Sequence, residues 1–156
     1  MSHRPTWRLL DSGAADGYSN MAIDEALLLA MQSDLVPPTL RVYAWQPACL
    51  SIGAFQSVGS DVDSDACTAR GIDWVRRLTG GRAILHTDEL TYSVAAPEAE
   101  PRVAGGVMDS YLRLSNALVV GLQRAGLDDV EKAGGSVRAG PDVSAACFEV
   151  PSAYEI

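Results

Sequence analysis

Residues 72–86 have the sequence IDWVRRLTGGRAILH. Two apolar runs, at 72–78 and 83–85, predict β-strands on either side of a segment with three arginines and two glycines. We call residues 76–82 the arginine–glycine loop. Its glycines would allow a ligand to approach backbone N–H groups, and its guanidinium groups bind carboxylate or phosphate oxygens. A Gly-Gly hairpin turn with solvated arginines is an equally good interpretation of the same residues.

Alternating apolar and polar residues predict further strands outward from this segment, at 7–10, 39–45, 50–54 and 90–96. Residues 11–17 are rich in Gly, Ala and Asp and predict a turn. Short extended segments are expected at 147–150 and 154–156, on either side of Pro151. The strands follow one another at hairpin spacing, with helices at irregular intervals. This order predicts one mixed α+β domain over residues 1–156, with a largely antiparallel sheet flanked by helices.

Helical periodicity predicts helices at 20–32, 61–70 and 108–125. Ser19 is the expected N-cap of the first helix, and Gly126 the expected stop after the last one. The first helix carries an apolar stripe that we expect to face the core: Ile23, Ala26, Leu27, Ala30 and Met31.

The composition narrows the possible functions of this 156-residue chain, which is 47% apolar and has a formal net charge of −8. So acidic a chain is a poor candidate for nucleic-acid binding. No apolar run is long enough for a transmembrane helix, and the N-terminus lacks a secretory signal. The three cysteines fit neither a zinc-site spacing nor a disulfide framework, so we expect no metal and a cytoplasmic location.

Two further residues are candidates for chemistry. His86 follows the second strand of the opening segment, where it could orient a substrate or relay a proton; the alternative is a structural histidine at a strand end. Cys147 follows two alanines and could be an exposed nucleophile, whereas a free cysteine is more often a small buried apolar residue. Cys49 and Cys67 lie in apolar or helical surroundings and are expected to be structural.

Several segments, taken in order, resemble the lipoate-protein ligase A and octanoyltransferase family, within the biotin- and lipoate-ligase superfamily. They are NMAIDEA (20–26), RVYAW (41–45), SIGAFQ (51–56), RRLTGGRAILH (76–86) and ELTYSV (89–94). The resemblance implies a catalytic domain like those of class II tRNA synthetases and biotin ligases, in which the arginine–glycine loop lines a tunnel for the acyl chain. The expected substrate-binding residues are Arg76, Arg77, Gly80, Gly81, Arg82 and His86.

The C-terminal sequence ACFEVPSAYEI (146–156) resembles the cysteine-dependent octanoyltransferases. The resemblance implies that Cys147 is catalytic. It would take an octanoyl group from acyl carrier protein as a thioester and pass it, without a cofactor, to a lysine of a lipoyl-accepting domain such as glycine cleavage protein H. The family also places a lysine shortly after this region, but the one lysine of the chain, Lys132, lies upstream.

We therefore expect the chain to be the N-terminal part of such an enzyme, which is truncated, cleaved, or complemented by a C-terminal segment on another chain. Two alternatives remain. An ATP-dependent lipoate-protein ligase would use ATP and magnesium and release pyrophosphate. A non-catalytic acyl- or lipoyl-domain-binding module would need no nucleophile.

Overall fold

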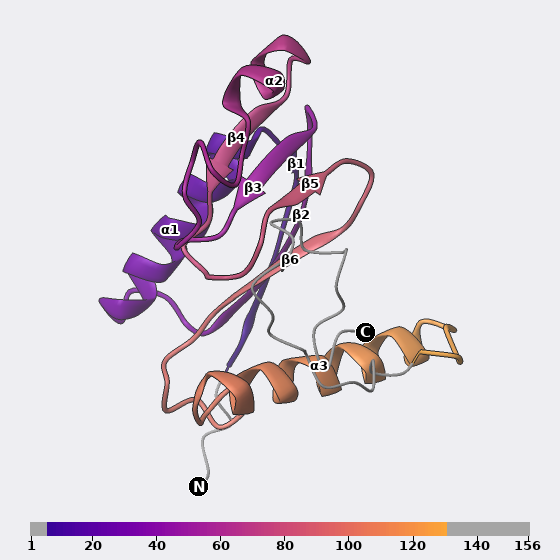
Figure 1. The fold of residues 1–156 in the computed structure, drawn as a ribbon. Coiled ribbons are helices and arrows are strands. Elements are labelled where there is room, and N and C mark those ends of the chain that lie inside the picture. The colour runs from indigo at the N-terminus through magenta and orange to yellow at the C-terminus, as the bar shows by residue number, and fades with distance from the viewer. Residues whose placement is uncertain (1–5, 131–156) are drawn as a thin grey trace, which may run out of the picture. The chain divides into compact units, whose positions relative to one another are not determined.

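Two mixed sheets form the framework of residues 6–97 in the computed structural model, which describes residues 6–130 (Figure 1). In the first sheet, β2 (Thr39–Trp45) lies between β1 (Arg8–Ala15) and β6 (Thr91–Ala95). β1 pairs with β2 in parallel, and β6 pairs with β2 antiparallel. The predicted strand at 7–10 is thus longer than expected, because residues 11–15 continue it through a register shift between Asp11 and Ala14 instead of forming a turn.

The second sheet explains the path of the arginine–glycine loop. β3 (Cys49–Ile52) lies between β4 (Asp73–Arg76) and β5 (Ile84–His86), parallel to the former and antiparallel to the latter. β4 and β5 flank the loop in sequence but do not pair with each other, so the loop is a crossover and not a hairpin turn. The mixed α+β class is confirmed, although parallel pairings are as frequent as antiparallel ones in these two sheets.

Helix α1 (Gly17–Gln32) contacts strands of both sheets. It begins three residues earlier than predicted, because the side chain of Asp16, and not Ser19, caps it by accepting a hydrogen bond from the Ser19 N–H at 2.9 Å. The start of the helix packs closely on β3: a Cβ atom at Gly17 would lie 2.4 Å from the Cys49 Sγ.

The predicted apolar stripe of this helix is only partly correct. Met31 is buried, but Ala26 is exposed and Ile23, Leu27 and Ala30 are half-buried. Asn20 is fully buried instead. The inward face is polar near its N-terminal end because it meets the buried Arg41 of β2.

Apolar side chains cluster in two groups around β3. One comprises Tyr43, Trp45, Cys49 and Val75, and the other Ile52, Val62 and Ala83. The short helix α2 (Ser64–Ala69) packs beside the second group through Cys67. Along β2 the predicted alternation is confirmed, since Arg41, Tyr43 and Trp45 are buried and Val42 and Ala44 are half-buried.

Residues 98–130 form the described part of a second unit, whose main element is α3 (Val107–Arg124). At its start the Asp109 carboxylate accepts a hydrogen bond from the Gly106 N–H at 3.1 Å. At its end Gly126 adopts a φ of 96°, which confirms the predicted stop. Within residues 6–130, no helix is both long and apolar enough to cross a membrane. The single-domain organisation of residues 1–156 stays a prediction, and the expected segments at 147–150 and 154–156 lie outside the described residues.

Candidate functional site

The arginine–glycine loop packs backbone to backbone against the turn that follows β3. The Ala54 N–H donates to the Thr79 carbonyl at 2.9 Å. A Cβ atom at Gly53 would lie 2.0 Å from the Gly81 carbonyl oxygen, so only glycine fits at position 53. Gly81 itself has a φ of 94°, which a residue with a side chain adopts with strain.

Arg76 and Arg77 hold this arrangement through carbonyl oxygens. Arg76 Nη1 donates to the carbonyls of Gly53, Ala54 and Gln56 at 2.7–3.2 Å. Arg77 Nη1 donates to both oxygens of Ser51, and its Nη2 donates to the carbonyls of Gly80 and Arg82. The two guanidinium groups therefore act as clamps on the loop, and their predicted contacts with a substrate stay predictions.

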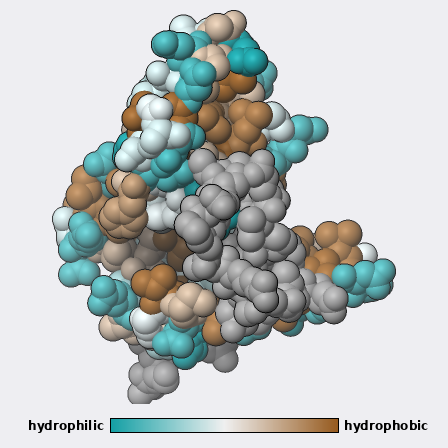
Figure 2. All heavy atoms as spheres, in the orientation of Figure 1, coloured by the Kyte–Doolittle hydropathy of each residue, from teal (hydrophilic) through white to brown (hydrophobic). Residues whose placement is uncertain are grey.

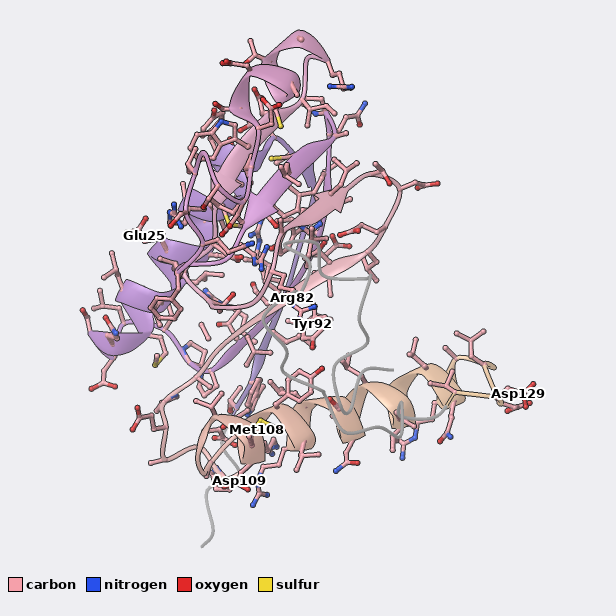
Figure 3. All side chains as sticks on the ribbon, viewed as in Figure 1. Glu25, Arg82, Tyr92, Met108, Asp109 and Asp129 are labelled. Atoms are coloured by element: carbon pink, nitrogen blue, oxygen red, sulfur yellow. The ribbon has the colours of Figure 1, made fainter. Side chains whose placement is uncertain are left out.

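Arg82 differs from the other two arginines of the loop. Its Nη1 is buried but has no hydrogen-bond partner among the described residues (Figure 3). A buried guanidinium nitrogen without an acceptor is energetically unfavourable unless a ligand or water supplies one. Arg82 is thus the side chain of this loop best suited to receive an anionic or carbonyl oxygen.

His86 lies at the end of β5, inside a chain of hydrogen bonds. Its Nε2 is 2.6 Å from the Ser51 Oγ, and its Nδ1 is 2.5 Å from the Glu89 Oε1. The Trp45 ring stacks on the imidazole with centroids 4.0 Å apart. The residue is 3% exposed, and burial is the main cause that lowers the pKa of His86 below its ordinary value. The Arg77 charge also lowers this pKa, whereas Glu89 raises it.

Ser51 and Glu89 were not predicted as part of the site, and neither was Thr91. The Thr91 hydroxyl donates to Glu89 at 2.8 Å, and Trp45 Nε1 donates to the Thr91 oxygen at 2.8 Å. The available signals were weak: a serine within an apolar strand, and a glutamate three residues after a histidine. Neither signal indicates that the strand order brings Ser51 and Glu89 to opposite sides of the same histidine ring.

The cysteines divide as expected where the structure describes them. Cys49 is fully buried, and burial raises the pKa of its thiol to about 12, so it is no nucleophile near neutral pH. Cys67 is half-buried in α2. Cys147 and Lys132 lie outside the described residues, so the catalytic role of Cys147 stays a prediction.

Two other features bear on ligand binding. A groove of about 400 Å³ between α1 and β4 is lined by Tyr18, Met21, Ala22, Glu25, Trp74, Val75 and Arg76. Of the predicted site residues it includes Arg76 alone. Among residues 6–130, no three His, Cys, Asp or Glu side chains come together as metal ligands would.

Residues 16–146 match the family described as the lipoyl protein ligase A/B catalytic domain. The chain belongs to this family. The membership confirms the prediction made from the ordered motifs at 20–26, 41–45, 51–56, 76–86 and 89–94. It also places the arginine–glycine loop and the hydrogen-bond chain of His86 within the family's catalytic domain.

Curated relatives of this family member are named octanoyltransferases. The chain is 53% identical to octanoyltransferase LipM of Moorella thermoacetica over 97% of the chain and 55% of that protein. It is 48% identical to octanoyltransferase LipM of Kyrpidia tusciae over 97% of the chain and 56% of that protein. The chain therefore spans about half the length of the curated relatives it matches.

Solved structures of lipoate-protein ligases share the fold. Lipoate-protein ligase A bound with ATP superposes with a TM-score of 0.69 at 28% identity, over 85% of this chain and 51% of that one. The bi-partite lipoate protein ligase of Thermoplasma acidophilum, studied with its E2 lipoyl domain, gives a TM-score of 0.61 at 26% identity, over 86% and 50%.

Proposed function

We propose that the protein containing this chain is an octanoyltransferase that carries the acyl group on Cys147. The Cys147 thiolate attacks the carbonyl carbon of octanoyl-acyl carrier protein, the bond to the phosphopantetheine sulfur breaks, and that thiolate leaves and takes up a proton. The ε-amine of an acceptor lysine then attacks the new thioester. An amide forms, Cys147 leaves as a thiolate, and the proton of the amine passes to solvent.

The observation that carries this proposal is the 53% identity to an octanoyltransferase over nearly the whole chain. The acceptor would be a lipoyl domain such as glycine cleavage protein H, and the location cytoplasmic. A related ligase was studied together with its E2 lipoyl domain, which supports an acceptor of this class. The reaction is balanced without a cofactor.

The buried Arg82 Nη1 supports a substrate contact in the arginine–glycine loop. Negative charge develops on the acyl carbonyl oxygen when a thiolate attacks it, and a guanidinium N–H already held in place would stabilise that charge. The side chains of Arg76 and Arg77 donate to backbone and serine oxygens instead. We therefore assign the acyl carbonyl to Arg82 and the shaping of the loop to its two neighbours.

Intact-protein mass spectrometry with octanoyl-acyl carrier protein tests the proposal, with the chain supplied together with the C-terminal segment of an octanoyltransferase relative. We expect one octanoyl adduct on Cys147, and Cys147→Ser should nearly abolish transfer while the control Cys67→Ser leaves it intact. An adduct on Cys49 or Cys67, or full transfer by the Cys147→Ser variant, would contradict the mechanism.

Arg82→Met should slow adduct formation by roughly a hundredfold, the usual loss for one oxyanion donor. Arg70→Met is the matched control, because Arg70 is an exposed arginine at the end of α2. Equal rates for the two variants would remove Arg82 from the site.

The ligase alternative has support from the ATP-bound neighbour at 28% identity. ATP would need donors for its phosphate oxygens, and three guanidinium groups of one loop would be a natural set. Arg76 Nη1 and both Nη atoms of Arg77 already donate hydrogen bonds to oxygens of the protein. This use of the guanidinium groups does not fit a phosphate clamp made of all three arginines. Release of pyrophosphate from ATP in the presence of lipoate would establish the ligase activity.

A further inference from the structure

The hydrogen-bond chain around His86 has one consistent direction. Arg77 Nη1 can only donate and the Glu89 carboxylate only accepts, so with a neutral His86 ring the Ser51 oxygen accepts from Arg77 at 2.6 Å and the Ser51 hydroxyl donates to His86 Nε2. Nε2 then accepts, which places the ring proton on Nδ1, where it donates to the Glu89 carboxylate. The carboxylate also accepts from the Thr91 hydroxyl. The neutral Nδ1–H tautomer of His86 satisfies each of these groups.

Serine, histidine and glutamate linked in this order have the connectivity of a hydrolase triad, but the surroundings argue against a nucleophilic role. Ser51 is completely buried, so no substrate reaches its oxygen. That oxygen already accepts a hydrogen bond from a guanidinium group, which lowers its nucleophilicity. The chain ends instead on Arg77, whose Nη2 holds the carbonyls of Gly80 and Arg82.

We propose that Ser51, His86 and Glu89 are positioning residues that orient Arg77 and thereby hold the arginine–glycine loop in its binding shape. Neutral His86 is the form that does so, and protonation on Nε2 would turn an acceptor into a second donor facing the Ser51 oxygen. The loop would then loosen at low pH. The value of this role for acyl transfer rests on the proposed function, whereas the role itself is a property of the folded chain.

The charged and titratable groups around His86 favour its neutral form on balance. Glu89 favours the protonated ring, while Arg77 and burial favour the neutral one, and burial dominates. Cys49 lies opposite His86 in the register of β3 and β5, and its raised pKa keeps it neutral. Trp45 covers one ring face without a charge.

Two measurements on the uniformly labelled 156-residue chain test the proposal without a substrate. Imidazole 1H–15N correlation spectra report the tautomer of His86, and we expect the Nδ1–H form at neutral pH. Amide hydrogen exchange at Ala54 reports loop closure, because that N–H donates to Thr79 across the loop. The Gln46 amide, bonded to Ala15 in the first sheet, is the internal reference.

Ser51→Ala should lower the protection of Ala54 relative to Gln46 by about tenfold, the effect of removing a hydrogen bond to a charged group. Ser93→Ala is the matched control, since Ser93 of β6 donates to Asp24 of α1, outside this chain of bonds. Glu89→Ala should mix the two tautomers and lower protection similarly. Glu89→Gln retains an acceptor for the Nδ1–H, so it should keep both the single tautomer of His86 and the protection of Ala54.

The neutral Nε2–H tautomer in the unaltered protein would overturn the proposal. So would unchanged Ala54 protection in Ser51→Ala, or an equal loss in Ser93→Ala. Below the pKa of His86, Ala54 protection should fall relative to Gln46, and a pH-independent ratio would also overturn it. These readouts are separate from octanoyl transfer, so a failed Cys147 adduct with a loop held as described contradicts the proposed function alone.

Discussion

Three arginines lie in one seven-residue loop, and they differ in what their guanidinium groups meet. Arg76 donates to carbonyl oxygens of the turn that follows β3, and Arg77 donates to carbonyl oxygens of the crossover between β4 and β5. A planar guanidinium reaches several carbonyls at once, which a lysine ammonium does not do with the same geometry. Arg82 Nη1 has no such partner within residues 6–130, and it is the donor that the proposed function assigns to the acyl carbonyl.

Gly53→Ala tests whether the loop depends on close backbone approach. The added methyl group would lie 2.0 Å from the Gly81 carbonyl oxygen, so the two backbones must separate. We expect a loss of about 1–3 kcal/mol in the free energy of unfolding, the usual range for overpacking. Urea denaturation measures it.

Gly121→Ala, in α3, is the control for the Gly53 variant. A Cβ atom at Gly121 would have nothing within 4 Å, so this change should be neutral or slightly stabilising. A Gly53→Ala protein as stable as the parent would show that the loop moves away without cost.

At this scale the sequence predicted residue types better than residue roles. The arginines and glycines are predicted because cations and glycines together are unusual in an acidic chain, and His86 because it follows the strand that leaves the loop. The separate roles of the three arginines depend on which carbonyl oxygens lie within their reach. That in turn depends on β3 lying between β4 and β5. No local pattern encodes that order, so Ser51 and Glu89 were missed.

Among the elements, α1 is unusual in presenting a polar face to the core. Arg41 of β2 is completely buried and donates to Ser12, to both oxygens of Asn20 and to Asp24. Its guanidinium also lies 3.8 Å from the centre of the Tyr43 ring. A prediction of the inward face of α1 from apolar residues alone is therefore partly wrong, because the strand that this face meets carries a buried cation.

Asp24→Ala should cost about 3–5 kcal/mol of unfolding free energy, because it leaves the buried Arg41 without its carboxylate. Asp24 also accepts from Tyr43 and Ser93, so three donors lose an acceptor. Chemical denaturation provides the measurement. Glu25→Ala is the control on the same helix, because Glu25 is exposed (Figure 3) and its loss should change stability by less than about 0.5 kcal/mol. A loss below about 1 kcal/mol for Asp24→Ala would show that the pair adds little.

At the scale of the whole unit formed by residues 6–97, His86 lies where the two sheets meet. Trp45 of the first sheet stacks on His86 of the second, and it also bonds to Thr91 of β6. Polar and apolar side chains intermingle on the face shown in the space-filling view (Figure 2). Two large apolar residues, Phe55 and Leu90, are largely exposed. The fold class could be predicted from strand and helix periodicity, but the junction of the sheets could not, because it depends on pairings between distant strands.

This junction predicts a pH dependence of global stability. The pKa of His86 is lowered in the folded protein, mainly by burial, so the unfolded chain binds the proton more readily. Unfolding therefore takes up a proton at mildly acidic pH. The stabilisation from neutral His86 is complete above the ordinary histidine pKa of 6.5 and is lost as pH falls towards the lower folded value. The slope for one proton is at most about 1.4 kcal/mol per pH unit.

Urea unfolding between about pH 7.5 and 5 measures this slope, and His86→Gln provides the comparison because it removes the titrating ring. His3, the other histidine of the chain, is present in both proteins and cancels in the difference. We expect the difference in unfolding free energy between the parent and His86→Gln to shrink as the pH falls. Parallel curves would show that His86 binds the proton equally well in both states. A difference that grows on acidification would mean that the Glu89 carboxylate outweighs burial and that His86 is held as a cation.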